Sequence, residues 1–187
     1  MRLATVRLNN EEQTVIIRND EVVLLRHLNE RLNKEYPLSL LPLIETDLLQ
    51  SLKRDCASLQ QEDWDAVQKF SLDEVHFVAP YRNPTHIFGV GMNYVEKAQD
   101  LQATPVDHAP VCFLKPATSL IGMNESIVLP RVSKRVTAEG ELSLIIGKRC
   151  FEVSEEEALD YVIGYTASLD LTASDIHAQN PRFIQMS

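Results

Sequence analysis

The sequence predicts an α+β protein that is mainly β, with a small α+β domain over residues 1–79 and a second, strand-built domain over residues 80–187. Three observations predict this class. Short alternating segments open the chain, apolar residues at helical spacing follow them, and further strand-like segments come after a proline-rich break at residues 80–84. The expected helices therefore lie mostly in the first domain.

The composition is that of a globular chain with an acidic balance. The chain has 187 residues, 44% of them hydrophobic, and a formal net charge of −9. Because its acidic residues are dispersed, we exclude nucleic acid and anionic membranes as partners. No stretch is long and apolar enough to span a bilayer, and the first residues lack the apolar core of a signal peptide. Three widely spaced cysteines predict reduced thiols in a cytoplasmic protein.

The first domain is expected to combine three strands with helices. Residues 2–8, 14–18 and 21–25 alternate or are β-branched, and short polar turns separate them. Apolar residues then recur every three or four positions and predict one helical stripe: Ile44, Leu48, Leu49, Leu52, Cys56 and Leu59. Trp64, Val67 and Phe70 continue this spacing after a break near Gln60. We interpret both runs as core and expect no chemistry before residue 80.

Strands dominate the prediction for the second domain. The expected strands cover residues 87–91, 111–116, 126–130, 139–147 and 161–169. One helix is expected over residues 93–100. Another is expected to begin at Ser154, because Glu157 three residues later would complete a capping box.

Glu139 and Glu141 are the first candidate site. Residues two apart on a strand share a face, so both carboxylates would point the same way while Leu142, Leu144 and Ile146 form an apolar back. Two adjacent carboxylates repel unless a cation lies between them, and a hard divalent cation such as Mg²⁺ suits oxygen ligands. Asp170, expected at the end of the next strand, would add a third carboxylate and leave positions for water and substrate. The alternative is a solvated polar face on an edge strand.

Lys115 and Lys97 are two further candidate site residues. Lys115 ends an apolar strand, where an unpaired ammonium is costly to bury, so it should either reach solvent or meet negative charge. Lys97 and Asp100 lie three residues apart on the expected helix, where they share a face. A surface ion pair is the simpler interpretation of those two residues.

Together these segments resemble the fumarylacetoacetate hydrolase (FAH) family, and they occur in that family's order. The blocks are Gly89-Val90-Gly91-Met92-Asn93-Tyr94, Phe113-Leu114-Lys115-Pro116, Glu139-Gly140-Glu141-Leu142, Ile145-Ile146-Gly147-Lys148 and Gly164-Tyr165-Thr166 with Asp170-Leu171-Thr172-Ala173. The first 80 residues look like the small domain that precedes the catalytic domain in bacterial members. The resemblance implies a mixed β-sheet roll, usually in a homodimer.

The resemblance also implies a chemistry. It implies Glu139, Glu141 and Asp170 as ligands of Mg²⁺ (or Mn²⁺), Lys115 as the active-site lysine, and Asn93, Tyr94 and His177 as substrate-binding residues. The family includes 2-hydroxyhepta-2,4-diene-1,7-dioate isomerases, acylpyruvate hydrolases and oxaloacetate decarboxylases. Many of these substrates are small 2-oxo acids, and the setting is aromatic catabolism.

This sequence departs from the family pattern in four places. Lys97 stands where the family usually has a histidine, with Asp100 as the acid three residues later. Ser174 stands where an arginine is usual, and Ala138 replaces an aromatic residue before the first glutamate. The chain stops at Ser187, where members continue into further strands. We therefore expect an incomplete roll that forms a homodimer or pairs with a chain supplying the missing strands.

These features predict a Mg²⁺-dependent enzyme that acts on a small 2-oxo acid through a metal-stabilised enolate. The loss of the usual histidine favours isomerisation or decarboxylation over hydrolysis, because Lys97 is protonated near neutral pH unless it is buried. A second enzymatic alternative is acylpyruvate hydrolysis with Asp100 or His177 as the base. The alternative from another class is a catalytically silent subunit with a binding or assembly role.

Overall fold

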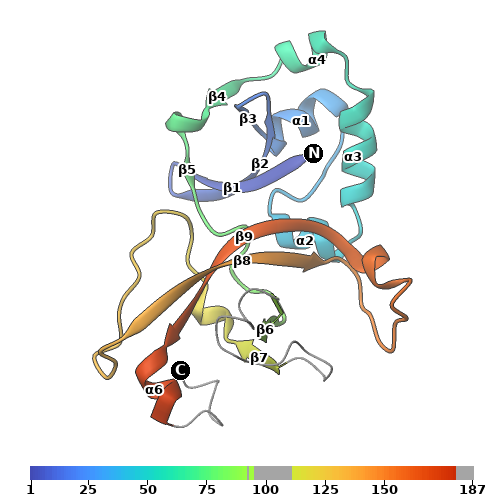
Figure 1. The fold of residues 1–187 in the computed structure, drawn as a ribbon. Helices are drawn as coiled ribbons and strands as arrows, with labels where there is room; N and C mark the ends of the chain where they lie inside the picture. The colour runs from blue at the N-terminus through green and yellow to red at the C-terminus, as the bar shows by residue number, and fades with distance from the viewer. Residues whose placement is uncertain (92, 95–110, 180–187) are drawn as a thin grey trace. The chain divides into compact units, whose positions relative to one another are not determined.

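The computed structural model describes residues 1–91, 93–94 and 111–179 (Figure 1). It contains one five-stranded sheet, two two-stranded sheets and several short helices, so the predicted α+β class is confirmed. No helix among the described residues is long and apolar enough to cross a membrane.

The described residues form two compact units. The first contains Met1–Tyr81, Ile121–Ile127 and Glu141–Ser168, and the second contains the described residues of 82–120, 128–140 and 169–187. Because segments of the two units alternate along the chain, the domain boundary predicted after residue 79 stays a prediction.

An antiparallel sheet forms the centre of the first 80 residues. Its order is β4-β3-β2-β1-β5, and its strands are β1 (Arg2–Leu8), β2 (Glu11–Arg18), β3 (Glu21–Leu24), β4 (Lys69–Ser71) and β5 (His76–Phe77). Two-residue turns at Asn9-Asn10 and Asn19-Asp20 join β1 to β2 and β2 to β3. All four turn residues have positive φ, between 50° and 65°. Such turns match the twist of a hairpin and suit Asn and Asp, so the three strands predicted first are confirmed.

Short helices follow the hairpins. They are α1 (Leu25–Leu32), α2 (Leu40–Glu45), α3 (Leu49–Ser58), α4 (Gln61–Asp65) and the 3₁₀ helix η1 (Leu72–Glu74). The predicted apolar stripe is split between α2 and α3, because Asp47 takes a left-handed φ of 56°. Phe70 lies in β4, opposite Val22, so the helical spacing predicted through it is wrong.

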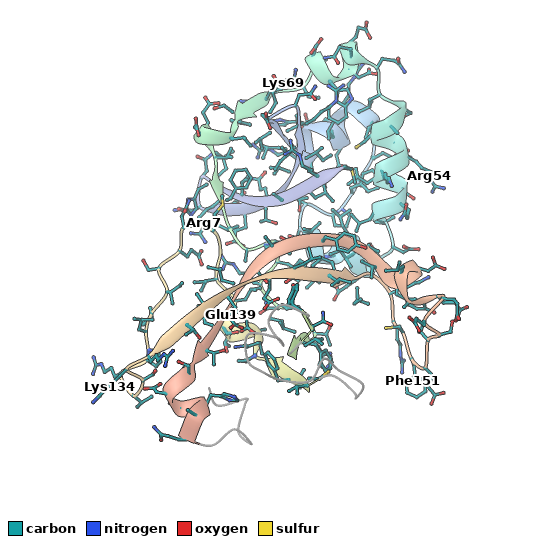
Figure 2. The ribbon with its side chains drawn as sticks, viewed as in Figure 1. Arg7, Arg54, Lys69, Lys134, Glu139 and Phe151 are labelled. Atoms are coloured by element: carbon teal, nitrogen blue, oxygen red, sulfur yellow. The ribbon has the colours of Figure 1, made fainter. Side chains whose placement is uncertain are left out.

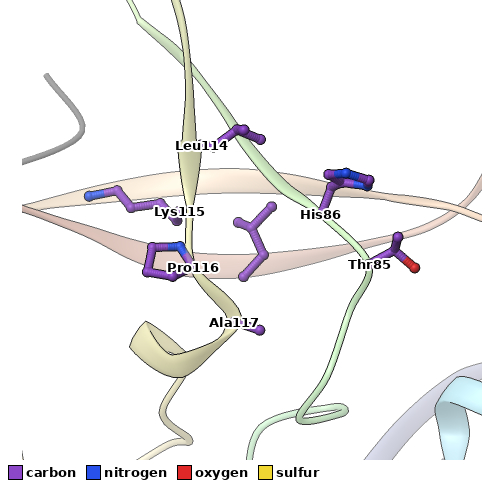
Figure 3. Close-up of a pocket in the computed structure, with 7 residues that line it drawn as sticks. Thr85, His86, Leu114, Lys115, Pro116 and Ala117 are labelled. Carbon is purple, nitrogen blue, oxygen red and sulfur yellow. The ribbon is translucent and has the colours of Figure 1, made fainter.

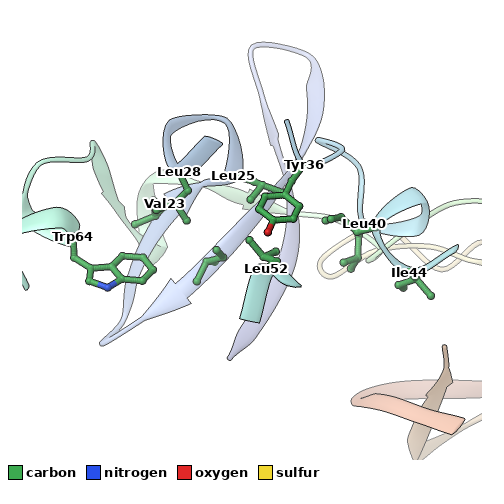
Figure 4. Packing of buried hydrophobic residues seen from close by; sticks show 10 residues of the cluster. Val23, Leu25, Leu28, Tyr36, Leu40, Ile44, Leu52 and Trp64 are labelled. Carbon is green, nitrogen blue, oxygen red and sulfur yellow. The ribbon is translucent and has the colours of Figure 1, made fainter. Parts of the chain in front are cut away.

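Apolar side chains cover both faces of this sheet. On one face, Ile16 and Val23 pack with Leu25, Leu28 and Leu52 from the helices (Figure 4). On the other face, Val6, Val15, Val22 and Leu24 form a second cluster. Leu28 and Leu52 are fully buried, and truncating such a leucine to alanine typically costs about 2–5 kcal/mol.

Strand pairs dominate the remainder of the chain. β6 (Ile87–Gly91) pairs antiparallel with β7 (Val111–Lys115), and β8 (Val136–Ile146) pairs with β9 (Val162–Ala173) (Figure 1). The 3₁₀ helices η2 (Ala117–Ser119) and η3 (Ala158–Tyr161) and the helix α6 (Ser174–Gln179) complete the described elements.

Two predicted elements are wrong. Residues 126–130 form no strand and pair with no strand among the described residues, and Val128 is 89% exposed. The helix expected from Ser154 is a turn followed by η3. Its capping box does not form, because the Ser154 hydroxyl donates to the Glu157 carboxylate (3.1 Å) instead of accepting from the backbone.

Two further expectations on the strands are wrong. Asp170 was expected at a strand terminus, but β9 continues to Ala173, so Asp170 lies inside the strand. The apolar back of β8 is not packed in this chain, since Leu142, Leu144 and Ile146 are 58%, 49% and 51% exposed. The helix predicted over residues 93–100 lies mainly outside the described residues.

Candidate active site

The β6–β7 pair places Lys115 at the end of a strand. Lys115 lies opposite Ile87, and Phe113 lies opposite Gly89. Since alternate residues share a face, Lys115 and Phe113 point to the same side of the pair. The exposed face of this pair carries Phe88 and Leu114, which also lie opposite each other.

Gly89 makes room for the Phe113 ring. A Cβ atom built at Gly89 would lie 2.2 Å from Cζ of Phe113, so a larger residue there would require the ring to move. The Lys115 ammonium lies 5.5 Å from the centroid of the same ring, a cation–π distance. The glycine and the aromatic ring therefore help to fix the direction of the lysine side chain.

Lys115 meets a carboxylate instead of ending in solvent. Its Nζ lies 2.7 Å from Oδ1 of Asp170 and donates a hydrogen bond to the carbonyl of Leu171 (2.8 Å). The two charged side chains are 26% and 23% exposed, so water screens their attraction only in part. Of the two alternatives for Lys115, the structure shows the one in which it faces negative charge.

Asp170 Oδ1 is a buried oxygen. Among the described residues, the Lys115 ammonium is the only cation close to it. Although the two atoms form an ion pair, Oδ1 receives no hydrogen bond of acceptable geometry there. The charge of this oxygen is therefore already compensated by Lys115, and a metal bound there would have to compete with the ammonium.

Glu139 and Glu141 follow the predicted alternation on β8. Both are half-buried, whereas Ala138, Gly140 and Leu142 between and beside them are exposed. Figure 2 shows Glu139 on β8. Further along the same face, the hydroxyls of Ser143 and Ser168 lie 2.7 Å apart and link β8 to β9. The sequence analysis did not identify that hydroxyl pair.

The chemistry of the donor set fits a hard divalent cation. Glu139, Glu141 and Asp170 would supply only oxygen atoms, which Mg²⁺ and Mn²⁺ prefer. Within the described residues, however, no group of three or more His, Cys, Asp and Glu side chains is arranged to hold a metal. The three-carboxylate site therefore stays a prediction.

Five other residues were predicted to belong to the site. Asn93 and Tyr94 are exposed and belong to no regular element, while Lys97 and Asp100 lie outside the described residues. His177 is a half-buried residue of α6, and its buried Nδ1 has no hydrogen-bond partner in the described part of the chain. The predicted roles of these five residues stay predictions.

A pocket of about 400 Å³ adjoins Lys115, and residues of 85–87 and 114–117 line it (Figure 3). In that view the Lys115 side chain extends away from His86 and Thr85. His86 stacks on Phe88, with ring centroids 6.0 Å apart. Lys115 thus lines this pocket while its ammonium contacts Asp170.

A family model described as "Fumarylacetoacetate (FAA) hydrolase C-terminal" matches residues 86–187. A protein of Pyrococcus abyssi is 51% identical over 96 residues, which are 51% of this chain and 42% of that protein. The human mitochondrial oxaloacetate tautomerase FAHD2A is 38% identical over 102 residues, which are 54% of this chain and 32% of that protein. The chain thus spans less than half the length of these curated relatives.

Solved structures share the fold over nearly the whole chain. A fumarylacetoacetate hydrolase from Exiguobacterium antarcticum matches with a TM-score of 0.73 and 23% identity, covering 97% of this chain and 59% of that one. A maleylpyruvate hydrolase from Sphingobium sp. SYK-6, in complex with manganese(II) and pyruvate, matches with a TM-score of 0.67 and 26% identity. That match covers 92% of this chain and 59% of the other.

Proposed function

This chain belongs to the fumarylacetoacetate hydrolase family, and we propose that it is a metal-dependent enzyme acting on a small 2-oxo acid. The observation that carries this proposal is the Lys115–Asp170 pair, a cation and a carboxylate at 2.7 Å with one oxygen left without a hydrogen bond. Such a pair supplies both charge for an anionic substrate and an oxygen for a metal.

Similar proteins support the choice of substrate class. The Sphingobium maleylpyruvate hydrolase is in complex with manganese(II) and pyruvate, and the human relative is an oxaloacetate tautomerase. Pyruvate and oxaloacetate are both small 2-oxo acids, whose carboxylate and neighbouring carbonyl form a natural chelating pair. We propose the same substrate class and Mg²⁺ or Mn²⁺ for this chain.

Each residue of the proposed site has a distinct task. Glu139, Glu141 and Asp170 would hold the metal, which when bound acts as a Lewis acid on the 2-oxo group. Lys115 would stabilise the negative charge that develops on oxygen as the enolate forms. Asn93, Tyr94 and His177 are proposed to contact the substrate.

We favour proton transfer over hydrolysis as the reaction. In keto–enol tautomerisation a proton leaves the carbon beside the 2-oxo group and another adds to the oxygen, so no water is consumed. The human relative is named an oxaloacetate tautomerase, which supports this choice. Because Lys97 is a poor base while protonated, Asp100 or His177 is proposed to take the carbon-bound proton. Decarboxylation would use the same charge stabilisation by Lys115.

Calorimetric titration with Mn²⁺ is the first test. Wild-type protein is compared with Glu141→Gln, which removes one charge at the proposed site, and with Glu156→Gln, the same change at an exposed turn. We expect saturable binding in the wild type and the Glu156 variant, and loss of binding in the Glu141 variant. Absence of wild-type binding, or equal binding in all three, would refute the metal site.

Oxaloacetate tautomerisation, followed by the disappearance of the enol absorbance, then tests the activity. We expect turnover in the wild type with Mn²⁺ and none after chelation. Metal binding without turnover of oxaloacetate or acylpyruvates would favour the catalytically silent subunit instead.

A further inference from the structure

Asp175 is a carboxylate whose two oxygens both accept hydrogen bonds from the loop that leads into β8. Its Oδ1 accepts from the Ser133 hydroxyl (2.6 Å), and its Oδ2 accepts from the backbone N–H of Lys134 (2.8 Å). Oδ1 also lies 3.0 Å from the N–H of Ile176. Figure 2 shows Lys134 in this loop.

The neighbouring residue reinforces the same connection. Ser174 donates two hydrogen bonds to the carbonyl of Arg135, from its N–H (2.9 Å) and from its hydroxyl (3.1 Å). The N–H of Arg135 in turn donates to the Ser133 hydroxyl (3.2 Å). These contacts join residues 133–135, just before β8, to residues 174–175, just after β9. We call this set of contacts the 133–175 clamp.

The clamp lies close in sequence to two proposed ligands. Val136 is the first residue of β8, and Glu139 lies three residues further on; Asp170 lies three residues before the end of β9. Strand alternation has a period of two, so a slip of one residue would turn Glu139 to the opposite face. A fixed start of β8 therefore determines on which face Glu139 stands.

The charge of Asp175 suits this task. The hydrogen bond from Ser133, with further bonds from backbone N–H groups, lowers the pKa of Asp175 below its usual range. The carboxylate is then ionised at neutral pH, and bonds to an ionised acceptor are shorter and stronger than neutral ones.

We propose that Asp175 is a positioning residue, which through the 133–175 clamp fixes the register of β8 and thereby the placement of Glu139 for metal binding. This inference rests on the proposed function. Asp175 itself is neither a proposed ligand nor a proposed substrate contact, and its part in the site had not been predicted. The pattern Ser-Asp at a helix start is one sequence signal for Asp175, and that pattern normally indicates a cap.

A role restricted to capping α6 is the competing explanation. It would use the contact to Ile176 and leave β8 unaffected. The two explanations predict faster amide hydrogen exchange in different residues when Asp175 is changed. If the clamp positions β8, exchange changes in residues 134–140. If Asp175 only caps the helix, exchange changes in residues 176–179 alone.

The test uses Asp175→Asn, which removes the negative charge and replaces one of the two acceptor oxygens with an amide N–H₂. Ser133→Ala is the second variant. It removes the hydroxyl that donates to Asp175 (2.6 Å) and accepts from the Arg135 N–H, and it leaves the contact between Asp175 and the Lys134 N–H in place. Asp63→Asn is the matched control, because Asp63 also accepts from a backbone N–H, that of Gln60, and from a side chain, that of Arg31, at another place in the fold.

Mn²⁺ affinity by calorimetry and amide hydrogen exchange are measured for all proteins. We expect Asp175→Asn to weaken Mn²⁺ binding by about 10- to 100-fold, Ser133→Ala to weaken it less, and Asp63→Asn to leave it unchanged. Exchange in residues 134–140 should accelerate in the first two variants. If Asp175→Asn fails to fold, Ser133→Ala decides by the same two measurements.

The experiment distinguishes failure of the proposed function from failure of the Asp175 inference. A wild-type protein that binds no Mn²⁺ overturns the proposed function and this inference together. A wild-type protein that binds Mn²⁺, with unchanged affinity in the Asp175 and Ser133 variants or with faster exchange only in residues 176–179, overturns this inference alone.

Discussion

Lys115 combines three contacts in one side chain: the Asp170 carboxylate, the Leu171 carbonyl and the face of Phe113. Because the ammonium already neutralises Asp170, it has two separable effects on the proposed chemistry. It competes with a metal for Asp170 Oδ1, and it stabilises negative charge on the substrate. Removing it should therefore change metal binding and turnover in different directions.

We predict that Lys115→Met lowers kcat for oxaloacetate tautomerisation by about 10²- to 10³-fold, the usual effect of removing one group that stabilises an oxyanion. Mn²⁺ affinity should stay equal or rise, since Asp170 loses its competing cation. Steady-state kinetics and calorimetry measure the two effects. Lys148→Met, which removes a lysine stacked on Tyr161, is the control and should leave both unchanged. Unchanged kcat in Lys115→Met would contradict the assigned role.

At the scale of elements, strands were more predictable than helices. The alternation of β8 and the β-branched runs of β2 and β9 follow directly from side-chain period. Residues 126–130 have the same local composition, yet they form no strand, because a strand also needs a partner and the local sequence cannot supply that information. Ser154 and Glu157 have capping-box spacing, but their side chains bond to each other instead.

For the site, the sequence predicted the direction of side chains on a strand but not their partners from distant parts of the chain. Strand period predicted that Glu139 and Glu141 share a face, and the cost of burying an ammonium predicted that Lys115 meets a carboxylate or solvent. The choice of Asp170 as its partner, and the clamp through Asp175, depend on contacts 55 and 42 residues apart in sequence (115 to 170 and 133 to 175). Periodicity carries no information over such separations.

Gly122 lies in the segment Ile121–Ile127 and packs against the backbone of Val78 and Ala79. A Cβ at Gly122 would lie 2.6 Å from the backbone nitrogen of Ala79 and 2.8 Å from the Val78 carbonyl carbon. A backbone neighbour cannot rotate away, unlike the end of a side chain. The Glu125 carboxylate also accepts a hydrogen bond from the Gly122 N–H (2.8 Å), which holds the segment in a turn.

We predict that Gly122→Ala destabilises the protein by about 1–3 kcal/mol, the usual cost of forcing extra volume into a packed contact. Urea unfolding measures the change. Gly140→Ala is the matched control, because a Cβ there meets nothing within 4 Å. The control should be neutral or slightly stabilising. Equal stability of the two variants would contradict this prediction, because it would show that packing of the segment Ile121–Ile127 on residues 78–79 contributes nothing to the free energy of unfolding.

At the scale of the whole molecule, one apolar surface stands out on β8. Leu142, Leu144 and Ile146, which share one side of β8, are each between 49% and 58% exposed. We call these three residues the apolar β8 face. Strand alternation puts the proposed ligands on the opposite side of β8. Contiguous exposed apolar residues of this kind mark interaction sites in soluble proteins.

We propose that a second copy of the chain covers this face, and we predict a homodimer at micromolar concentration in sedimentation velocity. Leu144→Glu should shift the protein toward monomer, because a buried unpaired carboxylate opposes association at the centre of the face. Leu38→Glu is the matched control, since Leu38 is 44% exposed but lies outside this face. It should sediment as the wild type does.

The sedimentation result also bears on the site. If dimerisation stabilises β8, then Leu144→Glu should weaken Mn²⁺ binding at dilute protein, and raising the protein concentration should restore it by mass action. Leu38→Glu should show no such concentration dependence. A wild-type monomer that melts cooperatively at every concentration would contradict the homodimer. Glu141 and Leu142 are neighbours on β8, so packing on one side of the strand should affect metal binding on the other. A monomer that binds Mn²⁺ as tightly as expected would show instead that the two are independent.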